Sequence, residues 1–229
     1  IVMIVKDKDK TSDDIVGSIE LKIDDIIGAK NKYADLTYVN IYGSSLNKHG
    51  KIFAQMNYNA EIGSKWKGRI LIKIDVKSVD SPVAKVRPID DQAYLTEVYN
   101  KGCSKLWSVY FKLYSTYYLP DSKNYGVRIF MMERSQYFPP REAKNKSIDW
   151  NTSGSLQCFT LTDDVEELPD LFIYLTDKKG EYNICFQRIK ASVFHNNHDV
   201  MVIKLLPDPC VGKVSNMMLS GLVKIKICI

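Results

Sequence analysis

Hydrophobic and polar residues alternate in short runs along this chain, a pattern that predicts strands rather than helices. Residues 1–5 are all apolar, residues 6–14 are mostly charged or hydroxyl-bearing, and residues 18–24 alternate between apolar and polar side chains. Runs of β-branched residues favour buried strands, whereas Asp, Ser and Thr favour turns. Alternation with a period of two is typical of a half-buried strand. The opening segment is therefore predicted to be a strand, a carboxylate-rich loop and an antiparallel strand.

The same period of two predicts further strands, at residues 38–43, 66–74, 105–114, 125–132 and 155–161, with 125–132 as the partner of 105–114. The sharpest hairpin joins residues 168–175 to residues 182–189 through a turn that ends in Gly180. Residues 44–65 are expected to be a long polar connector. Residues 78–104 contain two prolines and a plausible short helix at 89–99, so they are the best candidate for a linker.

Length and composition narrow the class of protein. A chain of 229 residues that is 45% hydrophobic can bury one or two cores. It lacks any apolar run near the roughly 18 residues of a membrane span, so neither a transmembrane helix nor a signal peptide is expected. The net charge of +5 is spread over single lysines without a basic block, which argues against nucleic-acid binding. Five cysteines without C-x-x-C spacing indicate reduced thiols in a cytosolic protein.

The acidic loop is the strongest candidate for chemistry. Asp7, Asp9 and Asp14 would lie close together at one end of a sandwich. Carboxylates so placed repel one another unless a cation joins them, and Ca²⁺ takes six to eight oxygen ligands. The alternative interpretation is a solvated turn in which Asp and Lys alternate, because a short D-x-D occurs often by chance. Spacing alone leaves both interpretations open.

Other candidate sites are weaker. His195, His198 and Asp199 could hold a transition metal, but a solvated hairpin tip is the favoured interpretation because no cysteine lies at a suitable spacing. Glu166 and Glu167 are expected to solvate a loop rather than form a catalytic carboxylate pair. The sequence contains no G-x-S-x-G, G-x-x-x-x-G-K-[ST] or H-E-x-x-H motif, so an enzyme is not expected.

Residues 5–21, V-K-D-K-D-K-T-S-D-D-I-V-G-S-I-E-L, resemble a strand, the third calcium-binding loop and the next strand of a C2 domain. This resemblance places Asp7, Asp9 and Asp14 at cation-ligand positions. Asp13 is an alternative to Asp14, because the loop is one residue shorter than the commonest form of the family. The other carboxylates of such a site come from an earlier loop, so weak calcium binding is expected from this chain alone.

A narrower resemblance rests on Y-V-N-I-Y-G-S at residues 38–44 and W-K-G-R-I-L-I at residues 66–72, which are similar to motifs of ferlins. The hairpin at 168–189 is similar to the ferlin B segment, with Tyr174 where that family often has Trp. The resemblance implies an all-β chain: a partial C2-type antiparallel β-sandwich, then a second C2-like β-sandwich. Its expected parts are the C-terminal half of a C2 domain at 1–77, a linker with a short helix at 78–104, and a second C2-like β domain at 105–229.

The function implied by this resemblance is calcium-dependent binding to anionic phospholipid during membrane or vesicle fusion and exocytosis. The expected location is the cytoplasmic face of membranes or vesicles, with trafficking or fusion proteins as partners. The alternative is a calcium-independent structural or protein-interaction segment of a large trafficking protein. Residues 1–74 and 171–229 also share an order of strand, turn, strand, connector and strand, which suggests two similar units. In the second, Lys178 and Lys179 replace carboxylates, so no calcium binding is expected there.

Overall fold

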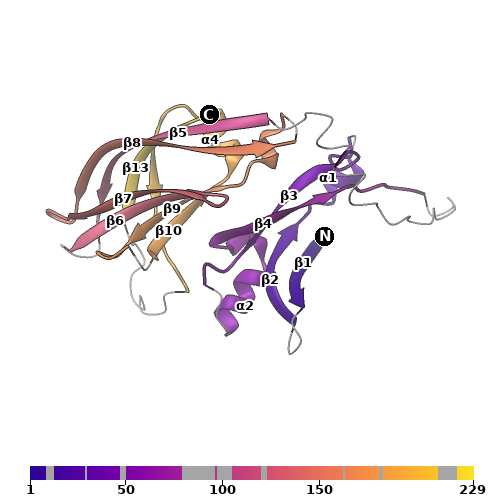
Figure 1. Cartoon of the computed structure of the whole chain (residues 1–229), viewed down its shortest axis with the longest axis horizontal. Helices are drawn as coiled ribbons and strands as arrows, with labels where there is room; N and C mark the ends of the chain where they lie inside the picture. Colours follow the sequence, from indigo (N-terminus) through magenta and orange to yellow (C-terminus); the bar gives the residue numbers. More distant parts are fainter. Residues whose placement is uncertain are drawn as a thin grey trace.

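A computed structural model describes residues 1–8, 13–28, 30–46, 50–78, 96, 105–119, 123–161, 163–180, 183–210 and 221–229, without the side chain of Asp13. All of its paired strands are antiparallel (Figure 1). The N-terminal unit, residues 1–78, has one four-stranded sheet in the order β1-β2-β3-β4. Its strands are β1 (Val2–Lys8), β2 (Asp13–Glu20), β3 (Thr37–Gly43) and β4 (Lys65–Ile72).

The C-terminal sandwich, residues 105–229, is built from two sheets. The four-stranded sheet has the order β11-β13-β5-β8, and the five-stranded sheet has the order β12-β10-β9-β6-β7. The strands of this unit are β5 (Lys105–Tyr117), β6 (Asn124–Met131), β7 (Arg134–Glu142), β8 (Ile148–Thr160), β9 (Leu171–Thr176), β10 (Asn183–Ile189), β11 (Val200–Lys204), β12 (Leu206–Pro207) and β13 (Leu222–Cys228).

Short helices connect these strands. They are α1 (Asp24–Ile27), α2 (Lys51–Tyr58), η1 (Ala60–Ile62), η2 (Val165–Glu167) and α4 (Ala191–Asn196). No helix in the described part of the chain is both long enough and apolar enough to cross a bilayer. The predicted class, an all-β antiparallel sandwich, is confirmed.

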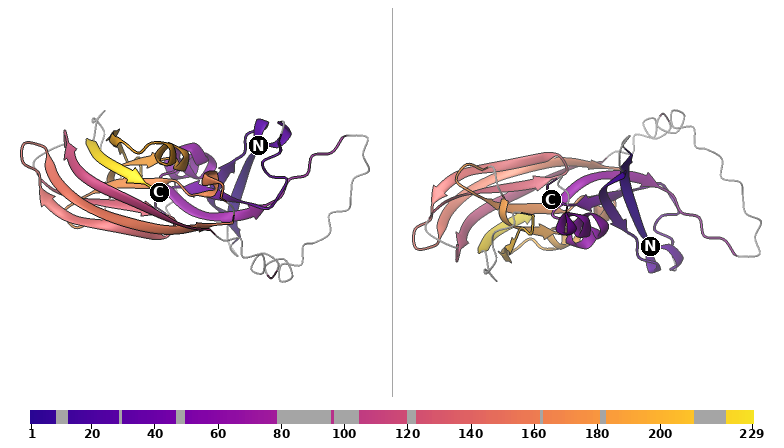
Figure 2. Two further views of the ribbon diagram at one scale, coloured as in Figure 1. Left: turned by 90° about the horizontal axis from the view of Figure 1, so that it is seen from above. Right: turned by 90° about the horizontal axis from the view of Figure 1, so that it is seen from below.

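The predicted division of the chain at residues 77 and 104 stays a prediction. The strands of the N-terminal unit come from residues 2–72 and those of the C-terminal sandwich from residues 105–228. The expected helix at 89–99 lies outside the described residues, apart from Thr96. Figure 2 shows the curved strands of the C-terminal sandwich at one end of the molecule and the N-terminal unit at the other.

The main core lies between the two sheets of the C-terminal sandwich and is filled by alternate residues of each strand. Its fully buried members include Val109, Leu113, Ile129, Ile173 and Ile225. All six residues of β9 are buried, because one face of this strand points into the core and the other meets the N-terminal unit. The five-stranded sheet therefore has the main core on one face and the contact with the N-terminal unit on the other.

A separate aromatic cluster joins the N-terminal unit to the five-stranded sheet. Tyr42 and Trp66 from β3 and β4 pack with Phe172 and Tyr174 from β9. The Phe172 and Tyr174 rings are stacked, with their centroids 6.0 Å apart and their planes 7° apart. Burial of several large rings stabilises such a contact strongly, because each removes a large apolar area from water. The two units are thus packed together through apolar surface as well as polar contacts.

The hairpin predicted at residues 168–189 is present as β9 and β10. Gly180 has a φ of +71°, which an L side chain rarely adopts, and a Cβ there would collide with the Tyr137 hydroxyl. The glycine that signalled the turn is therefore required by both the backbone and the packing.

Three sequence interpretations are wrong. Residues 44–65 contain α2 and η1 rather than only a connector. The strand at 124–131 pairs with β7 and β9, not with β5, which lies between β13 and β8. The suggested repeat has no common topology, since residues 1–74 form one sheet whereas residues 171–229 contribute strands to two. The order of elements differs as well, because residues 1–74 contain four strands and residues 171–229 contain five.

Candidate functional site

The structure brings two of the predicted calcium ligands together. Asp7 lies at the end of β1 and Asp14 at the start of β2, and the two residues are directly opposite each other. Directly opposed residues on antiparallel strands project from the same face, so both carboxylates lie side by side. Both residues are exposed. The sequence predicted that Asp7 and Asp14 lie close together in a loop, and they do so on strand ends instead.

The remaining predicted ligands are only partly described. Asp13 pairs with Lys8 across the two strands, and its side chain lies outside the described residues, as does Asp9. Within the described residues, no group of three His, Cys, Asp or Glu side chains is placed to hold a metal ion. Two carboxylates fit part of a calcium shell, and the other oxygens would have to come from elsewhere.

A cleft of about 850 Å³ opens beside this carboxylate pair. Asp7 and Asp14 line it together with Lys65 and Lys67 of β4. Burial, and then the charge of Lys65, lowers the pKa of Lys67. The rest of the cleft is lined by residues of β2, α2, β4, the end of β6 and the β6–β7 turn, including Tyr58, Trp66, Phe130, Met132 and Glu133. Because carboxylates and lysines line the same cleft, the cleft can bind both a cation and an anionic group.

The lysines of this cleft were missed by sequence reasoning. The sequence predicts a polar connector at residues 44–65, which ends at Lys65, and a strand at residues 66–74, which contains Lys67. Neither position has a motif that signals binding. They reach the carboxylates only because β4 pairs with β3, which in turn pairs with β2.

No family model matches the sequence, and no curated protein matches it. Among solved structures, the tandem C2 domains of extended synaptotagmin 2 are similar, with 16% identity over 99% of this chain and 66% of that chain and a TM-score of 0.42. A longer piece of extended synaptotagmin 2, which adds the SMP domain, gives the same identity and TM-score over 99% of this chain and 40% of that chain. A C2 domain-containing protein is 12% identical over 53% of this chain and 87% of that one, with a TM-score of 0.39. All three are C2-domain proteins, and the chain spans less than two thirds of the first two.

The other predicted sites do not assemble. His195, His198 and Asp199 are exposed, as predicted, but the predicted hairpin tip is wrong, because His195 lies in the last turn of α4. Its ring contacts the Trp107 ring edge-on, with the centroids 6.5 Å apart. Glu167 was expected to be solvated but is only 1% exposed. One of its carboxylate oxygens accepts a hydrogen bond of 2.9 Å from the Leu161 backbone N–H. Glu167 therefore has a structural role within the C-terminal sandwich.

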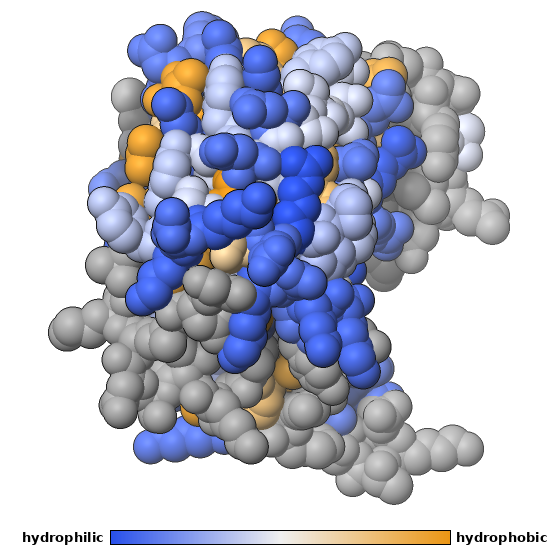
Figure 3. All heavy atoms as spheres, turned by 90° about the vertical axis from the view of Figure 1, so that its left-hand side faces the viewer, coloured by the Kyte–Doolittle hydropathy of each residue, from blue (hydrophilic) through white to orange (hydrophobic). Residues whose placement is uncertain are grey.

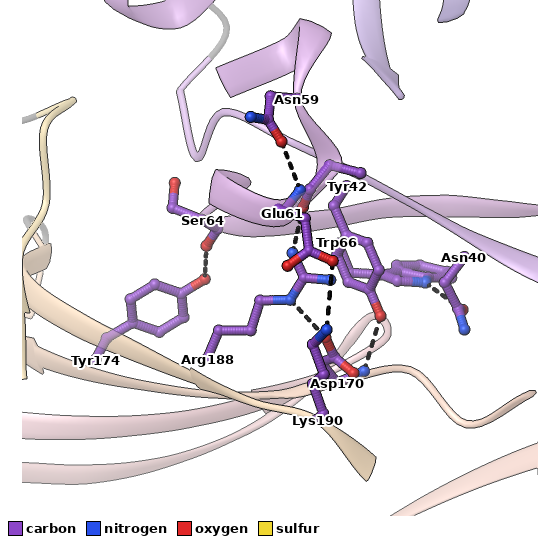
Figure 4. A network of polar contacts seen from close by, with 11 residues as sticks. Asn40, Tyr42, Asn59, Glu61, Ser64, Trp66, Asp170, Tyr174, Arg188 and Lys190 are labelled. Atoms are coloured by element: carbon purple, nitrogen blue, oxygen red, sulfur yellow. Dashed lines mark hydrogen bonds and ion pairs between the residues drawn. The ribbon is translucent and has the colours of Figure 1, made fainter. Parts of the chain in front are cut away.

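A buried polar network, which sequence reasoning also missed, lies where the two units meet (Figure 4). Arg188 of β10 donates to the Asp170 carboxylate at 2.5 Å and to the Ala60 carbonyl of η1. Its guanidinium lies 3.5 Å from the centre of the Tyr42 ring. The Asp170 backbone N–H donates to the Tyr42 hydroxyl at 2.9 Å. Arg188 thus connects Asp170 with two elements of the N-terminal unit.

The network is strongly desolvated. The side chains of Arg188 and Asp170 are only 14% and 11% exposed. Burial raises the pKa of the Asp170 carboxyl, and Arg188 opposes this shift. Burial, followed by the charge of Asp170, also raises the pKa of Tyr42. The Tyr174 hydroxyl completes the contact by donating to the Ser64 carbonyl at 2.5 Å.

Proposed function

We propose that this chain is part of a ferlin-like protein that binds anionic phospholipid in a calcium-dependent manner and acts in membrane or vesicle fusion. The observation that carries the proposal is the pairing of Asp7 with Asp14, where β1 ends and β2 begins. The ferlin motifs at residues 38–44 and 66–72 support the narrower assignment. The proposed location of the chain is the cytoplasmic face of a membrane, and its proposed partners are fusion or trafficking proteins.

In this mechanism, Asp7 and Asp14 would hold the cation, with Asp9 and Asp13 as further ligands. A bound calcium ion supplies positive charge and open coordination positions for phosphate oxygens. The residues of the chain prepare this contact: the two strands fix the carboxylates side by side, and Lys8 lies next to them on β1. Lys65 and Lys67, which share a cleft with the carboxylates, can bind a second oxygen of an anionic headgroup.

The β9–β10 turn of the C-terminal sandwich is proposed to bind no calcium. It contains Asp177 beside Lys178 and Lys179, and Arg128 donates to the Gly180 carbonyl at 3.0 Å. The two lysines next to this carboxylate oppose the approach of a divalent cation. This unit would serve in packing and in contacts with partners.

A binding role rather than a catalytic one is also proposed. Burial raises the pKa of the Cys158 thiol to about 11, which keeps it protonated at neutral pH. Cys185 and Cys210 are also buried and are not joined in disulfides. These thiols fit a structural part of the fold.

The test is co-sedimentation with vesicles of phosphatidylcholine and phosphatidylserine, in calcium and in chelator. We expect more binding in calcium, and we expect Asp7→Asn with Asp14→Asn to raise the calcium concentration needed by roughly tenfold or more, because the two carboxylates act on one ion. The matched control is Asp35→Asn with Asp75→Asn, which removes two exposed carboxylates flanking β3 and β4 at the opposite end of the same sheet.

The control should bind like the unchanged chain. Calcium dependence that survives in the Asp7 and Asp14 variant would contradict the proposed site. Equal binding in calcium and chelator by the unchanged chain would instead favour a calcium-independent structural segment. That second candidate is favoured by the buried contacts of Arg188 and the aromatic cluster, which would hold two units of a long protein in a fixed arrangement.

A further inference from the structure

The edge strands of the C-terminal sandwich differ in how they are protected. An edge strand exposes backbone N–H and C=O groups that can pair with another chain, and prolines, lysines or a short length normally prevent this. β7 contains Pro139 and Pro140, β11 has five residues and ends in Lys204, and β12 has only two residues. The remaining edge strand, β8, is 13 residues long and contains neither proline nor lysine.

The middle of β8 is an exposed and uncharged edge. Its register with β5 is unbroken over residues 152–160, so alternate residues point their backbone groups away from β5. Within the part of the chain that the structure describes, backbone hydrogen bonds join residues 151–158 to no strand or loop other than β5. Residues 150–161 carry no charge. The exposed side chains are Asn151, Ser153, Ser155 and Gln157. Residues 151–158 are called the free edge below.

An arginine lies at each end of the free edge. Arg141, at the end of β7, donates to the Asp149 carbonyl at 2.8 Å and to the Trp150 carbonyl at 3.1 Å. Arg69, from β4 of the N-terminal unit, donates to the Phe159 carbonyl at 2.7 Å. These contacts place one guanidinium beside the backbone at either end. The stretch of β8 from Trp150 to Phe159 is about 30 Å long.

Both arginines keep donors for a further partner. A guanidinium has five N–H donors in a planar fork that matches a carboxylate, and the contacts with β8 use only Nη1 of each arginine. Aromatic rings hold the two groups in place: the guanidinium carbon of Arg69 is 3.9 Å from the centre of the Tyr38 ring, and that of Arg141 is 5.2 Å from the Trp150 ring. Among the described residues, neither arginine forms an ion pair with a carboxylate.

The end of the sandwich is a poorer place for a protein partner than the free edge. Figure 3 looks at this end, and the side chains that it colours are mostly hydrophilic. A hydrophilic, solvated surface gives little apolar area to bury on association. The free edge instead offers a row of backbone donors and acceptors, which are the groups that bind a partner by β-strand addition.

The charges at the two ends of the free edge select its occupant. A second copy of this chain, paired antiparallel about Ser155, would bring Arg141 of one copy close to Arg69 of the other. These like charges would repel. A different strand with a carboxylate near each end would instead meet an arginine at both ends. Its central residues would be uncharged, because a charge opposite the free edge would lose hydration without gaining a partner.

We propose that the free edge of β8 binds an extended segment of a partner protein, which adds a fifth strand to the four-stranded sheet. The segment has two carboxylates about eight to ten residues apart, one for Arg141 and one for Arg69, with an uncharged stretch between them. Because these arginines come from different units, binding also depends on the packing of the units against each other. This inference goes beyond the proposed function, since it assigns a protein-binding site that needs neither calcium nor lipid.

The probe for this site is a fluorescent peptide of the sequence Glu-Thr-Val-Thr-Val-Thr-Val-Thr-Glu, capped at both ends. Its binding to the full chain is measured by fluorescence anisotropy in chelator. Two further forms carry N-methyl groups on one or the other set of alternate backbone nitrogens. A strand that joins β8 points only alternate N–H groups towards it. One form should therefore bind at least about tenfold more weakly, and the other should stay within about threefold of the unmodified peptide. Equal behaviour of the two forms, or no binding of the unmodified peptide, would overturn the proposal.

Variants of the chain test the two arginines. Arg69→Gln with Arg141→Gln should weaken binding by roughly tenfold, about threefold for each carboxylate contact. The matched control, Lys178→Gln with Lys179→Gln, removes two charges from the exposed β9–β10 turn and should change binding by less than about twofold.

A second peptide separates recognition from a structural effect of these substitutions. Replacement of both peptide glutamates by glutamine should weaken binding to the unchanged chain as much as the arginine substitutions do. The two losses should not add, because they remove the same contacts. Fully additive losses would overturn the proposal. Self-association of the chain in sedimentation equilibrium, in competition with the peptide, would also overturn it by assigning the free edge to a second copy.

Discussion

Replacement of Arg188 by Met is expected to lower the free energy of unfolding by about 3–5 kcal/mol. The substitution leaves the Asp170 carboxylate buried without its cation, and it removes the contact with the Ala60 carbonyl. Breaking one side of a desolvated ion pair costs far more than the pair contributes, because the remaining charge stays out of water. Urea unfolding followed by tryptophan fluorescence measures this change.

The matched control is Lys190→Met, two residues further along the same strand end. Lys190 pairs with Glu61 of the N-terminal unit at 3.3 Å, but both side chains are 55% exposed. Exposed pairs contribute about 0–1 kcal/mol, so the control should be nearly neutral. Similar losses for the two variants would contradict a special role for the buried pair. Recovery of part of the loss when Asp170→Asn is added to Arg188→Met would support it.

Phe172→Ala is expected to lower the free energy of unfolding by about 3–5 kcal/mol, the usual range when a buried aromatic side chain is truncated. Phe172 is fully buried and contacts rings from both units: its centroid is 6.1 Å from that of Tyr42 and 6.5 Å from that of Phe130. A cavity there would weaken the five-stranded sheet and its contact with the N-terminal unit together. Thermal and urea unfolding are the measurements.

Leu106→Ala is the control for this truncation, because Leu106 is 64% exposed on the four-stranded sheet. The free energy of unfolding of Leu106→Ala should differ from that of the unchanged chain by no more than about 0.5 kcal/mol. If Phe172→Ala were as mild as Leu106→Ala, the aromatic cluster would not be a stabilising contact. If Phe172→Ala mainly increased the proteolytic release of residues 1–78, its effect would lie at the contact between the units.

The strands could be predicted from local patterns because strand formation depends largely on residues that are close together in the sequence. The hairpin of β9 and β10 combines two β-rich runs with Gly180, whose positive φ is required by the turn. The pairing of Asp7 with Asp14 followed for the same reason, since a short connection brings the two strand ends together. Only the strand bounds moved: β1 extends to Lys8 and β2 begins at Asp13, which puts both carboxylates on strand ends.

The helix α2 could not be predicted because its stability comes from tertiary contacts rather than from its own sequence. Its N-cap, Gly50, provides no side-chain hydrogen bond. The helix is instead held by Asn57, whose side chain donates to the Ile15 carbonyl at 2.7 Å and accepts from the Ser44 backbone N–H at 2.7 Å. Packing of Met56, which is 2% exposed, adds to this. A short helix without caps is marginal by its own propensity.

The buried polar groups, and the sheet neighbours of residues on distant strands, could not be predicted from the sequence for a related reason. Glu167 can be buried because its carboxylate accepts a hydrogen bond from the Leu161 backbone N–H. The sequence does not reveal this partner, so a solvated side chain was the natural prediction. Lys112 and Lys226 become neighbours only through the register of β5 with β13. Sheet register between distant strands is set by the global fold, and single-sequence patterns do not determine it.

The most direct test is a calcium titration of the isotopically labelled chain followed residue by residue by NMR. The two-carboxylate site predicts that amide shifts begin at the ends of β1 and β2, around Asp7 and Asp14, and leave β5, β11 and β13 unchanged. Shifts centred on the β9–β10 turn, or an absence of shifts at Asp7 and Asp14 at millimolar calcium, would contradict the account.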